Sequence, residues 1–270
     1  MKLPTKIAKR LKLAQKYYLS LVFADCSKTK LLSANKKLQK TGASVTGVQM
    51  YPALAGSCSD YGDCILECIQ GTGIGQVVHA NKDTLTAIDK CNLRRLWLHN
   101  NERDYFYAQV KIELRKIQDD FKTVYFREVS TETIDHAAIG NNRSIKCYGY
   151  FKNIKKIDRL KERGYWRAMY SWNEKSAAVQ IDDCKTNNVP IAVVVPNKVF
   201  KVLLESKAPK GIYYHNGTAD DLASIKNYKR GKINLHLLAK RTSKNSKYVT
   251  KNRFMESYSN LLENLSIESV

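Results

Sequence analysis

The chain has 270 residues, 43% of them hydrophobic, which is enough apolar material for one large core or two small ones. The longest uninterrupted apolar run, Ile191 to Val195, is the size of a buried strand and is far shorter than the ~18 residues that a membrane span needs. No membrane partner is therefore expected. The seven cysteines are odd in number, and a chain of this length does not need disulfides, so a reducing compartment, the cytoplasm, is expected.

The formal net charge of +21 is concentrated in two segments. Residues 1–40 carry eleven Lys and Arg against one acidic residue, and residues 226–253 carry ten against none, so each segment has a net charge of +10. Blocks of a single sign favour a polyanionic partner, most often nucleic acid, although a lysine-rich genome also gives basic chains. The sequence therefore predicts DNA or RNA binding. The candidate contacts are Lys9, Arg10, Lys12, Lys36, Lys37, Lys229, Arg230, Lys240, Arg241, Lys244 and Lys247.

A basic helix is expected at the N-terminus, because apolar residues recur at helical spacing through residues 5–24, opposite a lysine-rich face. Beyond it, strand-like and helical stretches alternate. The strands are predicted over residues 45–54, 123–129, 145–151, 165–172, 191–195, 211–214 and 233–238. The helices are predicted over residues 82–119 (one helix, or a pair broken at Asn100–Asn101), 131–139, 154–162, 174–186 and 199–205, with a short amphipathic helix through Leu261, Leu262 and Leu265.

Strand–helix alternation at this spacing is typical of βαβ units. The predicted fold is therefore α/β, with a mostly parallel sheet or a partial (β/α) barrel and with basic helical N-terminal and C-terminal segments. The expected organisation is a basic helical segment over residues 1–40, an α/β domain over 41–240 that contains a three-cysteine loop at 58–68, and a basic arm with a short helix over 241–270.

Three cysteines in a glycine-containing loop, Cys58, Cys64 and Cys68, form the strongest chemical motif. Thiolates are soft ligands that suit zinc or an iron–sulfur cluster. Three protein ligands would leave one coordination position open for water or a small molecule. The spacing matches no standard zinc knuckle, so the alternative is that these are ordinary buried thiols. The remaining cysteines are expected to be structural: Cys26, Cys91, Cys147 and Cys184.

Charged and aromatic residues stand at the carboxyl ends of three predicted strands, where α/β proteins bind their ligands. The candidate catalytic residues are Arg127, Glu128, Tyr150 and Trp172. A structural role is the alternative for each, because strand ends are half-exposed and usually polar. The five histidines show no spacing typical of a metal site or a catalytic triad.

Several short segments, taken in their order along residues 31–248, resemble a family of phage proteins, the "gene product eighty-eight"-like proteins. These segments are Leu32–Leu38, Thr41-Gly42, Pro52-Ala53, the three-cysteine loop, Arg127–Ser130, Tyr148-Gly149-Tyr150, Val189–Val194, Asn216–Leu222 and Leu237–Lys240. The chain departs from the family at Ile69, where members often have tyrosine, and it has no cysteine after Cys184, whereas some members have more near the C-terminus.

The resemblance implies a phage protein in the cytoplasm of an infected host cell, in a family loosely labelled as replication-initiation proteins. The three-cysteine loop is also distantly similar to the cluster-binding loop of radical S-adenosylmethionine barrels. Three hypotheses follow. The first is a nucleic-acid-binding protein that acts in phage DNA replication or host takeover. The second is an iron–sulfur (radical S-adenosylmethionine-like) or zinc metalloenzyme, and the third is an inhibitor that binds a host protein.

Overall fold

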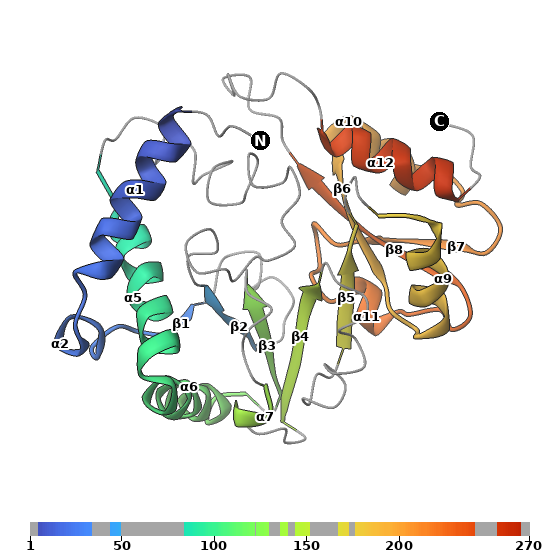
Figure 1. Ribbon diagram of the computed structural model, residues 1–270. Helices are drawn as coiled ribbons and strands as arrows, with labels where there is room; N and C mark the ends of the chain where they lie inside the picture. Colours follow the sequence, from blue (N-terminus) through green and yellow to red (C-terminus); the bar gives the residue numbers. More distant parts are fainter. Residues whose placement is uncertain are drawn as a thin grey trace. The chain divides into compact units, whose positions relative to one another are not determined.

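The chain divides into two compact units, and each is described here by itself (Figure 1). The structure, a computed structural model, describes residues 5–33, 44–49, 84–121, 123–129, 136–139, 144–151, 167–172, 176–240 and 253–265. The described residues up to Cys147 belong to the first unit and those from Tyr148 onward to the second. The division therefore falls within strand β4 (Ile145–Phe151).

The first unit is largely helical. Its helices are α1 (Thr5–Leu19), α2 (Phe23–Cys26), α5 (Ala87–Asn101), α6 (Arg103–Gln118) and α7 (His136–Ile139). A capping box starts α5, because the Thr86 hydroxyl accepts from the Asp89 N–H and the Asp89 carboxylate accepts from the Thr86 N–H. The chain leaves helical geometry at Glu102, so Ala87–Asn101 and Arg103–Gln118 form a helix pair whose break is one residue beyond the predicted one.

Packing between these helices forms the core of the first unit. Helices α1 and α2 contact α5, which contacts α6. Ala14 of α1 is fully buried beside Leu96 of α5 and Phe106 of α6 in one apolar cluster. The helix predicted over residues 5–24 ends earlier than expected, at Leu19. Its apolar face is part of the core, as the burial of Ala14 shows.

Three strands complete the first unit: β1 (Leu32–Ser33), β2 (Ser44–Gln49) and β3 (Val124–Val129). Strand β1 is antiparallel to β2, and β2 is parallel to β3. The Glu113 carboxylate of α6 accepts hydrogen bonds from the backbone N–H groups of Leu31 (2.9 Å) and Leu32 (2.8 Å). One side chain thus fixes the start of a strand too short to be stable alone.

The second unit contains a parallel sheet. Its strands lie in the order β4, β5 (Arg167–Ser171), β6 (Ile191–Pro196), β8 (Ile233–Lys240) and β7 (Ile212–Asn216). All the pairings between them are parallel. Strand β8, the last in the chain, therefore lies between β6 and β7, which places β7 at the edge of the described sheet.

Helices cover both faces of this sheet. They are α9 (Ala178–Thr186), α10 (Asn197–Glu205), α11 (Ala223–Lys226) and α12 (Arg253–Asn264). Leu235 and Leu237 of β8 pack in one apolar cluster with residues of α10 and α12, whereas His236 between them contacts Ser224 of α11. Because successive side chains of a strand point to opposite faces, α11 lies on the face opposite α10 and α12.

The predicted α/β fold with a mostly parallel sheet is confirmed, and the described strands include no closed barrel. The predicted segment boundaries at residues 40 and 240 stay predictions.

Helix α9 ends as expected, where Asn188 takes the left-handed φ of 56° that asparagine tolerates. The helix predicted over residues 154–162 lies outside the described residues. Among the described helices, none combines the length and the apolar character that crossing a membrane requires.

Replacing Glu113 with Gln tests the anchor of β1. The amide keeps one acceptor but turns an NH₂ toward the second backbone donor, so the variant is expected to lose about 1–3 kcal/mol of unfolding free energy. Urea unfolding measures this loss, and exposed Glu263→Gln is the control. Equal stabilities of the two variants would show that the Glu113 contacts do not anchor the strand.

Candidate functional site

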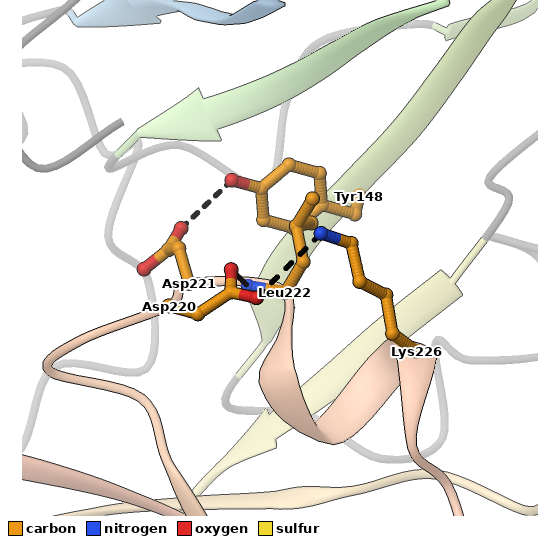
Figure 2. Close-up of polar contacts among 5 residues, drawn as sticks. All are labelled: Tyr148, Asp220, Asp221, Leu222 and Lys226. Atoms are coloured by element: carbon orange, nitrogen blue, oxygen red, sulfur yellow. Dashed lines mark hydrogen bonds and ion pairs between the residues drawn. The ribbon is translucent and has the colours of Figure 1, made fainter. Parts of the chain in front are cut away.

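A buried carboxylate, Asp221, joins two tyrosines of β4. The Tyr148 hydroxyl donates to Asp221 Oδ2 at 2.7 Å, and the Tyr150 hydroxyl donates to Asp221 Oδ1 at 3.1 Å. Figure 2 shows Tyr148 directed at the carboxylate from the strand, with Asp221 on the segment that leads into α11. Both carboxyl oxygens therefore accept hydrogen bonds, and these contacts replace the water that burial removes.

The same contacts continue to His236 of β8. Because the Tyr150 proton is directed at Asp221, the Tyr150 oxygen accepts from His236 Nε2–H at 3.1 Å. His236 Nδ1 lies 2.8 Å from Ser224 Oγ, and the Ser224 hydroxyl is also within 3.4 Å of Met169 Sδ. We call Tyr148, Tyr150, Asp221, Ser224 and His236 the tyrosine–aspartate network.

Gly217 lets the backbone approach the His236 ring. A Cβ atom at Gly217 would overlap the imidazole, so a larger residue there requires a shift of the ring or of the backbone. The Gly217 N–H donates to Leu237 O at 3.0 Å, which ties the end of β7 to β8. Glycine is therefore needed here for close packing on the imidazole.

The rest of the segment 216–222 is held by its own polar side chains. Asn216 Oδ1 accepts from the Ala219 N–H at 2.8 Å, and Thr218 Oγ1 accepts from the Ala239 N–H at 2.7 Å. Asp220 accepts from the Leu222 N–H at 2.8 Å and forms an ion pair with Lys226 at 3.5 Å (Figure 2). These contacts fix the backbone that carries Asp221 into the sheet.

The serine, histidine and carboxylate of this network are the residue types of a nucleophilic hydrolase, but their burial argues against that chemistry. Asp221, Ser224 and His236 are each 0% exposed, so no substrate reaches the Ser224 hydroxyl in this conformation. Tyr150 is the only network member that is half-buried. The network is therefore best explained as an internal polar core that fixes α11 against the sheet.

A second polar cluster organises the turn that precedes β8. Asn234 Oδ1 accepts from the Lys229 N–H (2.8 Å) and from His215 Nε2–H (2.9 Å). Asn234 Nδ2 donates to the carbonyls of Lys229 and Lys232, each at 2.9 Å. The Lys232 N–H closes the turn on the Lys229 carbonyl, and Gly231 supplies the positive φ of 69°. The side-chain amide of Asn234 thus holds residues 229–232, which we call the basic turn.

Exposed cations gather around the basic turn. Loops 206–211 and 227–232 precede the parallel neighbours β7 and β8, and the Ile233 N–H donates to Gly211 O at 3.0 Å, so the loops lie side by side. Neither loop contains an acidic residue. The exposed cations they carry, which we call the basic edge, are Lys207, Lys210, Lys229, Arg230 and Lys232.

The predicted nucleic-acid contacts are distributed over several surfaces. Lys229 and Arg230 lie on the basic edge, before β8 begins. Lys240 is the last residue of β8 and so lies at the other end of that strand. Lys9 and Lys12 are exposed on α1 of the first unit, and Arg10 lies in the same helix. Outside the described residues are Lys36, Lys37, Arg241, Lys244 and Lys247.

The candidate catalytic residues are divided between the two units. Tyr150 faces α11, whereas Trp172 is packed edge-on against Tyr170 in the cluster on the opposite face. Arg127 is half-buried on β3 of the first unit, and Glu128 follows it on the same strand. Tyr150 and Trp172 therefore pack on opposite faces of the sheet, and their catalytic role stays a prediction.

The three-cysteine loop, Cys58, Cys64 and Cys68, lies outside the described residues, so a zinc or iron–sulfur site there stays a prediction. Within the part of the chain that the structure describes, no group of three potential ligands could hold a metal ion. The other four cysteines are free thiols. Of these, Cys26, Cys147 and Cys184 are buried, as expected, and burial raises the pKa of Cys26 to about 11.

The sequence did not reveal the partners of the histidines. His236 pairs with Tyr150 and Ser224, and His215 pairs with Asn234, although neither histidine has a recognisable motif around it. The only sequence signal is indirect: the segments Tyr148–Tyr150 and Asn216–Leu222, both part of the phage-family resemblance, meet through Asp221.

No family model, curated protein or solved structure matches this chain significantly.

The packing of His236 against Gly217 predicts a non-additive pair of substitutions. Gly217→Ala alone is expected to cost about 1–3 kcal/mol of stability, because the new methyl group overlaps the ring. In a His236→Ala background the methyl group enters vacated space and should cost much less. Unfolding of the four proteins in urea measures the coupling, and additive costs would contradict it.

The stability of the second unit should depend on pH through His215. Burial, with a smaller contribution from nearby Lys229, lowers the pKa of His215 from its ordinary 6.5, while the hydrogen bond to Asn234 opposes the shift. Below about pH 6.5 the unfolded chain binds the proton more readily, so the stability present above that pH is lost as the pH falls through the folded-state pKa.

A His215→Gln variant keeps a donor for Asn234 but does not titrate. Its unfolding free energy should therefore fall less than that of the wild type between about pH 7.5 and about pH 5.5. Urea titrations at both pH values measure the difference, and equal losses in the two proteins would refute the assignment to His215.

Proposed function

We propose that the chain is a nucleic-acid-binding protein and that the basic edge of the second unit contacts the phosphate backbone. The observation that carries this proposal is the convergence of five exposed cations on two adjoining loops without an acidic residue. Lysine and arginine contacts to phosphates are the main source of affinity for nucleic acids, because they release condensed counterions.

The fixed backbone of the basic turn supports the proposal. A solubilising surface needs mixed charges but no particular backbone geometry, whereas Asn234 holds this turn at three backbone positions through hydrogen bonds of 2.8–2.9 Å. A cation-bearing turn that is ordered before binding loses less conformational entropy when a phosphate arrives. The geometry therefore favours a binding surface over general solubility.

The sequence resemblance implies a phage context for this activity. Under the proposal, the chain acts on nucleic acid in the cytoplasm of an infected cell, during phage DNA replication or host takeover. Lys9 and Lys12 on α1 would be a second contact surface. No contact among the described residues favours the metalloenzyme or the host-protein inhibitor over nucleic-acid binding.

Removing the cations of the basic turn should weaken binding and reduce its dependence on salt. In Lys229→Ala/Arg230→Ala/Lys232→Ala, the slope of log affinity against log salt is expected to fall in magnitude by about 2–3. Fluorescence anisotropy with labelled oligonucleotides over a salt series measures both quantities.

The matched control removes the same charge from the exposed surface of α6: Lys111→Ala/Arg115→Ala/Lys116→Ala. Its salt slope should stay close to that of the wild type. Equal effects of the two triple variants would mean that net charge alone controls binding, and an unchanged slope in the basic-turn variant would refute the proposed contact.

A further inference from the structure

An aromatic ring stands within the basic edge. Tyr213 of β7 is 39% exposed, and the Lys229 ammonium lies 5.9 Å from the centre of its ring. Tyr213 pairs in register with Asn234, the residue that holds the basic turn. Ring and turn are therefore fixed by adjacent strands of one sheet.

The exposure of Tyr213 contrasts with the burial around it. Its neighbours Ile212 and His215 are buried, so β7 is well packed and the exposed ring does not result from a loose strand. Nor does the Tyr213 ring belong to the apolar core. The residues of β7 that pack in the cluster on the opposite face are Ile212 and Tyr214. Tyr213 thus leaves aromatic surface in contact with solvent beside several cations.

The combination of an open ring and phosphate-binding cations matches an unpaired nucleotide. In a duplex the faces of the bases are stacked on one another, whereas a single strand presents them to a protein. A base that stacks on the Tyr213 ring would bring its phosphate within reach of the Lys229 ammonium, which lies over that ring at 5.9 Å from its centre. Cations alone bind both forms of nucleic acid and do not distinguish them.

We infer that the basic edge binds single-stranded nucleic acid, with Tyr213 as the platform on which a base stacks and Lys229, Arg230 and Lys232 as the contacts to its backbone. This inference rests on the proposed function and specifies its ligand. Stacking on an aromatic side chain requires no particular base, so the preference is for unpaired structure and not for sequence.

The test compares Tyr213→Ala with Tyr213→Phe on single-stranded and duplex probes. Loss of the ring should weaken binding of a labelled oligothymidine about tenfold, while Tyr213→Phe keeps the stacking surface and the affinity. Binding of a duplex of equal length should stay unchanged in both variants. Phe121→Ala, which removes an exposed ring (45%) of the first unit, is the matched control and should alter neither affinity.

A second readout does not depend on the folding of a variant. Ultraviolet crosslinking of wild-type protein to a single strand that contains 5-iodouracil should label the peptide that contains Tyr213, and mass spectrometry locates the adduct. Labelling confined to peptides away from residues 206–232 would overturn the inference.

The outcomes separate the inference from the function on which it rests. If the basic-turn variant loses binding but Tyr213→Ala affects neither probe, or weakens both equally, the single-strand assignment fails and nucleic-acid binding stands. If wild-type protein binds neither probe at low salt, the proposed function and the inference both fail.

Discussion

The burial of the Asp221 carboxylate constrains much of the second unit. An ionised group that is removed from water costs several kcal/mol unless hydrogen bonds replace its hydration. The replacement comes from Tyr148 and Tyr150, which are two residues apart on β4 and so direct their hydroxyls to the same face. This requirement fixes where the segment 216–222 must run, and it explains why Gly217 packs directly on the His236 ring.

The network also pairs polar groups with one another at one end of the described sheet. Parallel α/β sheets usually bind ligands at the carboxyl ends of their strands. Here the polar groups near the carboxyl ends of β4 and β7 are directed at one another: Asp221 at two tyrosines, and Asp220 at Lys226. At the amino ends of β7 and β8 the exposed charged side chains are all cations, with no acid in either loop. Under the proposed function, the cations at the amino ends of β7 and β8 would therefore complement a polyanion.

Local patterns in the sequence were enough to predict most elements but not the contacts between them. The apolar run at 191–195 gave a buried strand, and Asn188 ended a helix because asparagine tolerates a positive φ. The pairing of His236 with Tyr150 depends on the order of the strands across the sheet, to which no local pattern refers. Likewise, the loops that carry Lys210 and Lys229 lie side by side only because β7 and β8, the strands that follow them, are neighbours. The position of Trp172 at a strand end predicts a site residue, whereas its burial follows from the face it shares with Tyr170.

The second polar cluster shows how a strongly cationic surface can be rigid. Lys229, Arg230 and Lys232 repel one another, and ordering a backbone costs about 1–2 kcal/mol per residue, so an unsupported turn of this composition would be mobile. Asn234 uses two acceptor and two donor positions on His215 and the turn, which is the full capacity of an amide. The lowered pKa of His215 keeps that ring neutral near pH 7, so the cluster adds no further positive charge beneath the turn. Under the proposed function, the order that a phosphate would otherwise have to impose is therefore already present in the turn.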